Sequence, residues 1–287
     1  MYKIICIQAG LGNQMFQYAF ASALQEKLKE EQILLDNTWF DKNTNVKFGL
    51  DIFKTKIPFA SQEQIKYTTK KTTFLPKPFR LFFKIPKHKY IYEESEENFC
   101  TFYPNLFHSH YKYYKGYFQN ENYFKDIKEK IYDDFTFPTI KKEDIYTLQR
   151  LEKIQNTKNS VFVHIRRGDY LKVNWQLDTL YYKNAIRYIQ ERIENAKFFI
   201  FGATDLNFIK KLDLGCNFED LSQKIITHDN HYEDMRLMSL CNNGIVANSS
   251  YSWWAAWLNK HKHKIIVAPS NWINGYNEII CKDWIAL

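Results

Sequence analysis

His164 and Arg166 end the apolar run Val161-Phe162-Val163, and their types and spacing suit the binding of an anion. Such a run is typical of a parallel strand that is buried on both faces and opens into a ligand crevice at its carboxyl end. Strand alternation would place both side chains on one face. A guanidinium there matches phosphate or carboxylate and stays charged at any working pH. The alternative is a solvated basic loop after an ordinary strand.

Asn248, Ser249 and Ser250 form a second group with chemical capacity. They follow the apolar run 244–247 and open a helical pattern at 250–259, so backbone N–H groups and hydroxyls converge there. A simple helix cap is the alternative. The tryptophans of the helix are expected to pack it into the core (Trp253, Trp254 and Trp257). Two anion-binding strand ends in one sheet favour a nucleotide diphosphate as ligand.

Gly10, Gly12 and Asn13 form a third group, between an expected strand at 3–8 and a helix for which Asn13 is the expected N-cap. A glycine turn lets backbone N–H groups approach an anion or a sugar, while a plain strand-to-helix turn is the alternative. A dinucleotide-binding motif is weakly supported, because Met15 occupies its third glycine position.

The elements that must position these groups alternate regularly after residue 160. Strands are expected at 161–166, 197–202, 224–228, 244–248 and 264–268, and helices near 178–194, 205–212, 232–241 and 250–259. This alternation predicts an α/β protein with a doubly wound parallel sheet. The polar run 156–160 suggests domains at 1–155 and 156–270, with 271–287 packing back on the body. The irregular, aromatic stretch 41–137 is left unassigned.

Cysteine usage and the amino terminus bear on localisation. The 287 residues include five cysteines without C-x-x-C spacing, which argues for a reducing compartment and against a zinc site. The apolar run Ile4–Ile7 is too short for a signal peptide, so a cytoplasmic protein is expected. The sequence has no Asp-x-Asp pair for a metal-bound nucleotide sugar. Phosphate would therefore be neutralised by Arg166, backbone N–H groups and hydroxyls, without a metal or another cofactor.

The net charge of +8 is concentrated in one segment. Residues 54–89 carry ten Lys and Arg against one Glu, a net +9, which leaves the rest at −1. A nucleic-acid-binding face usually spreads its basic charge more widely, so no nucleic-acid partner is expected. Interleaved aromatics and lysines at 74–89 suit peripheral contact with the inner face of the cytoplasmic membrane. A solvated loop with its apolar residues tucked into the first domain is the alternative.

Taken together, the motifs resemble the α-1,2-fucosyltransferases of glycosyltransferase family 11. The segments that carry the resemblance are G-L-G-N-Q-M-F-Q-Y-A at 10–19, G-Y-F-Q-N-E-N-Y-F at 116–124, H-I-R-R-G-D-Y at 164–170, and D-M-R-L-M-S-L-C-N-N-G-I-V-A-N-S-S-Y-S-W-W-A-A-W-L-N at 234–259 with K-I-I-V-A-P-S-N-W after it. Their order and spacing run nearly from end to end. The resemblance implies a GT-B-like fold, with two Rossmann-like domains facing a cleft, and metal-independent inverting transfer from GDP-β-L-fucose.

The resemblance also implies roles for single residues. Arg166 would bind the donor diphosphate, with His164 beside it. Phosphate would also be bound by Asn248, Ser249 and Ser250. Asn13, in the turn with Gly10 and Gly12, would face the donor from the first domain. Relatives often carry an F-S-D-D-like segment where this chain has Phe201-Gly202-Ala203-Thr204-Asp205, which leaves Asp205 as a ribose or guanine contact.

The resulting hypothesis is fucosyl transfer to a galactose hydroxyl, O2 by preference, of a bacterial surface glycan whose lipid-linked form would lie at the membrane. Asp169 is ranked first as the base that takes the acceptor proton, ahead of Asp178, which also suits a helix N-cap. His164 is assigned to the donor side. Two alternatives stay open: another nucleotide sugar or acceptor on the same fold, and a module that binds nucleotide or glycan without catalysis.

Overall fold

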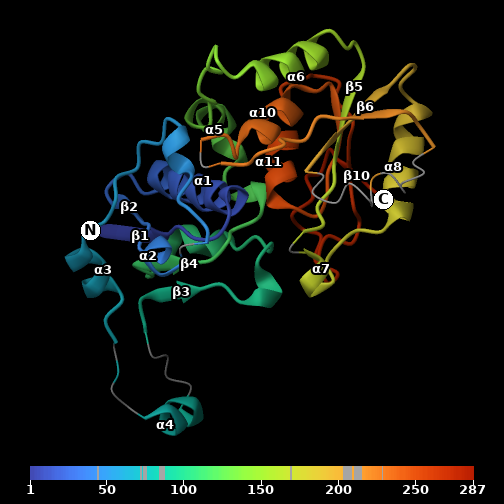
Figure 1. Ribbon diagram of the computed structural model, residues 1–287. Helices are drawn as coiled ribbons and strands as arrows, with labels where there is room; N and C mark the ends of the chain where they lie inside the picture. Colours follow the sequence, from blue (N-terminus) through green and yellow to red (C-terminus); the bar gives the residue numbers. More distant parts are fainter. Residues whose placement is uncertain are drawn as a thin grey trace. The chain divides into compact units, whose positions relative to one another are not determined.

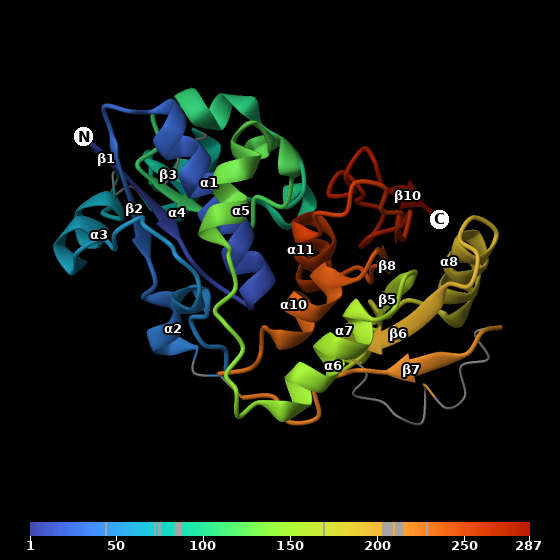
Figure 2. The same ribbon diagram turned by 90° about the horizontal axis from the view of Figure 1, so that it is seen from above.

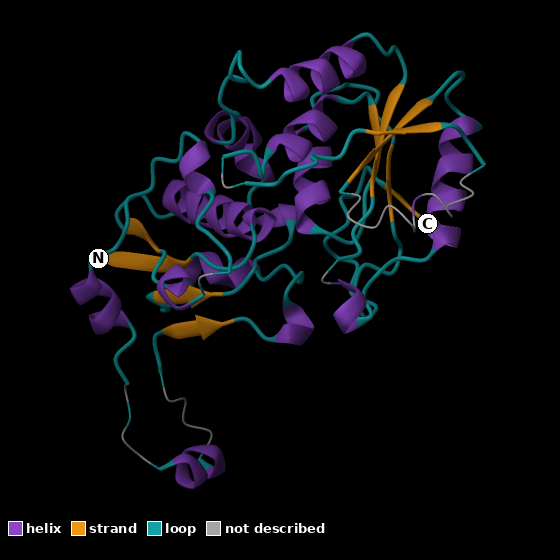
Figure 3. Ribbon diagram, viewed as in Figure 1, coloured by secondary structure: helices purple, strands orange, loops and turns teal. Residues whose placement is uncertain are grey.

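The computed structural model describes residues 1–43, 45–71, 73, 76–83, 88–168, 170–202, 209, 215–227 and 229–287. The chain forms two compact units, Met1–Thr136 and Phe137–Leu287. Each unit is built around a parallel sheet with helices packed against it (Figures 1 and 3). The predicted α/β class, with two Rossmann-like units as in a GT-B protein, is thereby confirmed.

The first unit contains a sheet in the order β2-β1-β4-β3. Its strands are β1 (Tyr2–Cys6), β2 (Gln32–Asp36), β3 (Ile91–Glu93) and β4 (Tyr113–Lys115). Its helices are α1 (Leu11–Lys27), α2 (Trp39–Lys42), α3 (Gln62–Thr68), α4 (Lys77–Phe82) and α5 (Lys128–Asp134), with short 3-10 helices at Leu50–Ile52, Glu96–Asn98, Pro104–His108, Glu121–Tyr123 and Lys125–Ile127.

Aromatic side chains fill the core around α1. Phe20 is fully buried and stacks on Phe118, with 4.1 Å between the ring centroids, while Tyr123 meets Phe20 edge to face. Phe107 and Phe124 are buried as well. These side chains of the 107–124 stretch therefore build the core of the first unit.

The second unit contains a sheet in the order β10-β9-β8-β5-β6-β7. Its strands are β5 (Ser160–His164), β6 (Lys197–Phe201), β7 (Phe218–Asp220), β8 (Asn243–Ile245), β9 (Ile266–Ala268) and β10 (Ile285–Ala286). Its helices are α6 (Ile145–Gln155), α7 (Tyr170–Val173), α8 (Thr179–Gln190), α10 (Glu233–Leu240) and α11 (Ser250–Leu258). Figures 1 and 2 show α8 on one side of this sheet and α10 and α11 on the other.

Both faces of β5 are buried, as the apolar run predicts. Val161 and Val163 pack with Ile186 of α8 in one core cluster. On the opposite face, the ring of Phe162 lies so close to Gly244 that a Cβ there would come within 2.1 Å of it. The tryptophans of α11 are buried too, which confirms their predicted role in the core (Trp253, Trp254 and Trp257).

The second unit begins earlier than the predicted boundary at 155/156. Arg150 on α6 is buried and donates hydrogen bonds to the carbonyl of Leu221 at 2.8 Å and to Asp234 at 2.7 Å. This ion pair fastens α6 to the second unit, and the compact units divide between Thr136 and Phe137. Residues 156–159 of the polar run thus connect α6 to β5 inside the second unit, and Ser160 begins β5.

One predicted strand is wrong, and one predicted helix cannot be compared. The strand expected at 224–228 is absent from the described residues there, and Ile225 and Ile226 are 74% and 63% exposed. Instead, β7 pairs with β6, and the N–H of Leu221 continues the pairing to Ile200 at 2.9 Å. The helix expected at 205–212 lies outside the described residues except for Ile209.

The last segment packs back on the second unit, as expected for 271–287. β10 pairs with β9 in parallel, and Trp272 and Trp284 are buried. The indole N–H of Trp253 donates to the carbonyl of Ile279 at 2.7 Å, which ties the segment to α11.

Candidate functional site

The predicted anion-binding groups lie at the point where the strand order of the second sheet reverses. From β5 the order runs through β6 to β7 in one direction, and from the neighbouring β8 through β9 to β10 in the other. Phe162 pairs with Gly244, and Val163 with Ile245. His164 ends β5, and Asn248 follows β8 after two further residues. Ligands of open α/β sheets bind outside the carboxyl ends of strands at such a reversal.

His164 is a buried, neutral imidazole. Burial, and secondarily the charge of Arg166, lower its pKa to about 3. Its ring lies 6.0 Å from that of Tyr251. Its Nδ1 is buried and makes no hydrogen bond within the described part of the chain. A neutral imidazole with so low a pKa is a weak base, but it still offers one hydrogen bond to a ligand.

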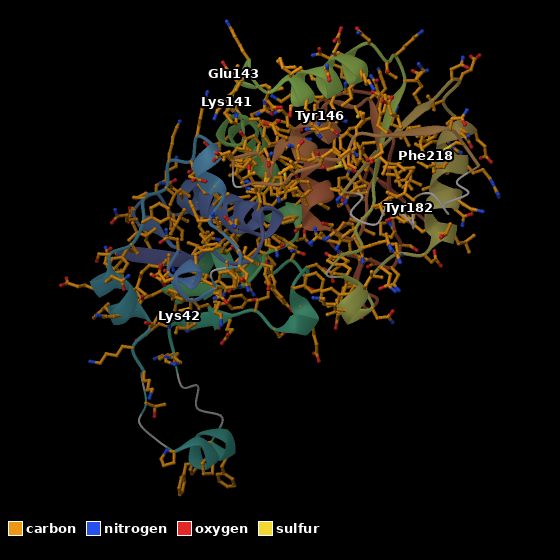
Figure 4. All side chains as sticks on the ribbon, in the orientation of Figure 1. Lys42, Lys141, Glu143, Tyr146, Tyr182 and Phe218 are labelled. Carbon is orange, nitrogen blue, oxygen red and sulfur yellow. The ribbon has the colours of Figure 1, made fainter. Side chains whose placement is uncertain are left out.

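Arg166 is half buried and held by two tyrosines. Its guanidinium carbon lies 5.2 Å from the centroid of the Tyr170 ring, a cation–π arrangement. Its backbone N–H hydrogen-bonds the hydroxyl of Tyr182, which projects from α8 (Figure 4). The hydroxyl of Tyr170 donates to the carbonyl of Asn248 at 3.2 Å, so one side chain connects the segments that follow β5 and β8.

Ser249 and Ser250 stand at the amino terminus of α11. Ser249 occupies the N-cap position, but its side chain makes no capping hydrogen bond, and the first turn of α11 contains no acidic residue. The Ser249 hydroxyl is therefore not used to cap α11, in contrast to the predicted alternative of a simple helix cap. The helix terminus with its N–H groups favours a negatively charged ligand.

Asn248 offers an acceptor to a ligand. Its Nδ2 donates to the carbonyl of Trp175 at 2.8 Å, whereas its Oδ1 is buried without a hydrogen-bond partner among the described residues. A carbonyl oxygen accepts hydrogen bonds and does not complement a phosphate oxygen. Its chemistry fits a hydroxyl or N–H of a ligand, rather than the phosphate contact that the resemblance implies.

Two predicted aspartates lie outside the described residues, Asp169 and Asp205. A third, Asp178, accepts the N–H of Tyr181 at 2.9 Å and caps α8. Asp178 therefore has the helix-capping role that was expected as the alternative to acting as a base.

The glycine turn of the first unit follows β1 and opens α1. Gly10 is the N-cap of this helix and Asn13 lies inside its first turn, so the predicted N-cap at Asn13 is wrong. The side-chain Oδ1 of Asn13 instead accepts a hydrogen bond from Gln119 at 2.7 Å. Because Gln119 follows β4 and β1 neighbours β4, this pair lies where the first sheet also reverses its order, with Gly12 alongside on the helix.

Sequence reasoning missed two positions beside these groups, Gly202 and Glu94. Gly202 has φ +76°, and a Cβ there would meet the ring of His164. The Glu94 carboxylate accepts the N–H of Tyr117 at 2.5 Å and that of Phe118 at 3.3 Å. Burial raises the pKa of Glu94 to about 8. The contact with His164 could have been anticipated, since Gly202 directly follows β6, the strand that pairs with β5. Glu94 carries no such signal.

The described ranges contain no cluster of three or more His, Cys, Asp and Glu side chains able to hold a metal ion. Their helices include none of sufficient length and apolar character to cross a membrane.

Comparison with known proteins identifies the family. The model of glycosyl transferase family 11 matches residues 3–286. The O-antigen biosynthesis glycosyltransferase WbnK of Escherichia coli is 30% identical over 98% of this chain and 99% of its own length. An α-1,2-colitosyltransferase of Escherichia coli is 31% identical over 93% of this chain and 90% of its own length. The solved fucosyltransferase NodZ from Bradyrhizobium aligns at 11% identity and a TM-score of 0.49, over 89% of this chain and 92% of its own. The chain therefore belongs to glycosyl transferase family 11 and is a glycosyltransferase.

Proposed function

We propose that this glycosyltransferase moves L-fucose from GDP-β-L-fucose to O2 of a galactose in a bacterial surface glycan, with inversion and without a divalent metal. The observation that carries the proposal is the convergence of Arg166 and the amino terminus of α11 where the second sheet reverses its strand order. A fixed guanidinium, helix N–H groups and two serine hydroxyls suit a leaving diphosphate.

In the proposed reaction the acceptor O2 attacks the anomeric carbon from the face opposite the diphosphate. The bond from that carbon to the phosphate oxygen breaks, and its electron pair leaves with GDP. Arg166, Ser249 and Ser250 stabilise the negative charge that develops on the diphosphate. The acceptor proton passes to a base, for which we propose Asp169.

The remaining residues are assigned to the donor. His164, with its pKa lowered to about 3, serves as a neutral hydrogen-bonding group. Asn248 accepts a hydroxyl or N–H through Oδ1. We keep Gly10, Gly12 and Asn13 as donor contacts from the first unit, and Asp205 as a ribose or guanine contact.

A second candidate donor is favoured by one of the relatives. That relative is an α-1,2-colitosyltransferase, and colitose is fucose without its 3-hydroxyl. A GDP-colitose donor would use the same diphosphate contacts, so the two candidates differ only around one hydroxyl of the sugar. The other relative acts in O-antigen biosynthesis, which supports a lipopolysaccharide glycan as the acceptor.

The deciding experiment incubates the purified chain with lactose and either GDP-fucose or GDP-colitose. We expect one fucosylated product whose new linkage, located by NMR, is to O2 of galactose. Transfer from GDP-colitose alone would reject fucose as the donor, while GDP binding without any product would favour the non-catalytic alternative. The same assay with excess EDTA should retain its rate. A loss of activity that Mg²⁺ restores would reject metal independence.

A further inference from the structure

A small basic cavity lies in the first unit, and its lining includes none of the residues assigned to the reaction. It has a volume of 170 Å³ and is lined by Tyr67, Thr68, Lys70, Lys71, Tyr90 and Lys112. We call it the lysine pocket. Its lining contains three ammonium groups and no carboxylate, so a bound anion would relieve the repulsion among the lysines.

The lysine pocket is built at one edge of the first sheet. Lys112 immediately precedes β4 and Tyr90 immediately precedes β3, and the N–H of Lys112 donates to the carbonyl of Tyr90 at 2.8 Å. Because these strands are parallel, the pocket lies at their amino ends. The glycine turn and Gln119 follow the carboxyl ends of strands in the same sheet. The pocket is therefore separate from the proposed donor contacts of this unit.

Aromatic rings fix the position of Lys112. Its ammonium nitrogen lies 5.1 Å from the centroid of Tyr90 and 5.8 Å from that of Tyr67. Lys70 and Lys71 follow the end of α3 and bring two further charges to the same cavity. Clustered ammonium groups suit a compact, strongly charged oxyanion such as a phosphate group.

Exposed phenylalanines lie close to this pocket along the chain. Phe79 and Phe82 are separated by one helical turn of α4, with Phe83 directly after it, and they are 57%, 81% and 61% exposed. Two connections of six residues each join α4 to this region, one from Lys71 to the start of α4 and one from Phe83 to Lys89. Six residues span at most about 20 Å, so α4 is tethered near the pocket at both ends.

We propose that the lysine pocket and the phenylalanines of α4 together form a docking surface for an anionic lipid bilayer. The pocket binds the phosphate of a lipid headgroup, and Phe79, Phe82 and Phe83 enter the boundary between headgroups and acyl chains. The net charge of +9 on residues 54–89 complements an anionic membrane surface. This inference goes beyond the proposed function and does not depend on which sugar is transferred.

The test is flotation of the full chain with vesicles, in the absence of any substrate. One set of vesicles contains phosphatidylcholine alone, and in the other phosphatidylglycerol replaces part of it. We expect binding to the anionic vesicles only, weakened by added salt. Binding to neither set, or equal binding to both, would reject the proposal.

Two variants locate the surface. The first variant removes the positive charge of the pocket by three substitutions, Lys70→Gln, Lys71→Gln and Lys112→Gln. The second removes the apolar contacts of α4 by Phe79→Ser, Phe82→Ser and Phe83→Ser. Each triple variant should lower the vesicle partition coefficient on the order of ten-fold or more. If the lysine variant binds vesicles like the parent, the lysine pocket is not part of the docking surface. If the phenylalanine variant does so, α4 is not part of it.

Matched controls come from the second unit. The lysine control removes the same charge from three exposed positions, by Lys141→Gln, Lys142→Gln and Lys158→Gln. Lys141 is labelled in Figure 4. Ile225→Ser with Ile226→Ser removes exposed apolar side chains. Both should bind like the parent; an equal loss in the lysine control would show that net charge alone drives binding. Adding inorganic phosphate should weaken binding through the pocket. If phosphate binds while vesicles do not, the pocket serves a free anion and the docking surface is rejected.

Discussion

A Cβ on Gly202 would lie 2.8 Å from Nε2 of His164. The backbone of Gly202, with φ +76°, thus closes over the edge of the imidazole. The relationship follows from the sheet, because His164 pairs with Phe201 across β5 and β6, and the N–H of Ile165 donates to the carbonyl of Phe201 at 2.9 Å. The glycine therefore helps to hold His164 where β5 ends.

Gly202→Ala should displace His164 and disturb donor binding. The added methyl would also come within 2.9 Å of the carbonyl oxygen of Ile165, so relief requires movement of the backbone. We expect a stability loss of about 1–3 kcal/mol and a fall in GDP affinity, measured by thermal unfolding and calorimetry. Gly275→Ala is the matched control, because Gly275 also has positive φ but no atom within 4 Å of its Cβ position. Equal effects in the two variants would attribute the loss to backbone strain alone.

Arg166→Lys should lose most of the transfer rate, although it retains a positive charge. A lysine ammonium does not reproduce the two parallel hydrogen bonds of a guanidinium, nor its packing on Tyr170. We expect kcat to fall on the order of a hundred-fold or more, and Arg166→Ala to fall further, with an unchanged circular dichroism spectrum. Arg192→Lys, at an exposed position near the end of α8, should act like the parent. Near-parental turnover in a folded Arg166→Lys protein would reject the proposed contact between Arg166 and the donor diphosphate.

Glu94 should make the protein less stable as pH rises. Burial raises its pKa from 4.5 to about 8, so the folded chain binds a proton in this range that the unfolded chain has released. The free energy of unfolding should therefore fall as pH increases from about 5 to about 8. Glu94→Gln mimics the protonated side chain and should flatten this dependence in thermal unfolding measured across pH. Glu93→Gln, which removes the exposed partner of Lys115, should leave the slope unchanged. A parental slope in Glu94→Gln would assign the pH dependence to other groups.

Asp169→Asn tests the proposed base. Asparagine is nearly the same size but cannot accept the acceptor proton, so turnover should fall by a factor of about 10²–10⁴ while GDP affinity is preserved. Rapid-quench assays with GDP-fucose, together with GDP titration, measure the two quantities separately. Asp178→Asn serves as the control, since Asp178 caps α8 and asparagine caps about as well. Turnover of Asp169→Asn at the parental rate would place the base elsewhere.

Local patterns predicted those parts of the site that follow directly from a strand. The apolar runs before His164 and Asn248 located β5 and β8, and the pairing of these strands brought their carboxyl ends together. The bridge formed by Tyr170 could not be predicted, because it depends on how the segment after β5 folds back toward Asn248. Strand alternation also ends at His164, so the position of Arg166 is set by tyrosines and not by the sheet.

The fold was least predictable where elements are short or where charge is buried. Strands β3 and β4 have three residues each, too few for a periodic pattern. The buried Lys3 on β1 helps to anchor the chain before β4, because its ammonium group donates hydrogen bonds to the carbonyls of Ser109 and Tyr111. The start of the second unit depends on the buried pair between Arg150 and Asp234, residues 84 apart in sequence. Composition alone carries no signal for such a pair.

The final prediction concerns Asn248, whose free acceptor distinguishes a hydroxyl contact from a phosphate contact. If Oδ1 accepts a ribose hydroxyl of GDP, then 2′-deoxy-GDP or 3′-deoxy-GDP should bind the parent about three- to ten-fold more weakly than GDP, the usual range for one hydrogen bond. In Asn248→Ala the same deoxy analogue should lose nothing further, because the partner of the missing hydroxyl is already gone. Calorimetric titration of both proteins with the three nucleotides completes this cycle. Asn242→Ala, at an asparagine that pairs with Ser160 instead, controls for the loss of a neighbouring amide and should retain the parental discrimination. An equal penalty for the deoxy analogues in the parent and in Asn248→Ala would show that Oδ1 does not accept a ribose hydroxyl, and would direct the search to the guanine N–H groups or to the transferred sugar.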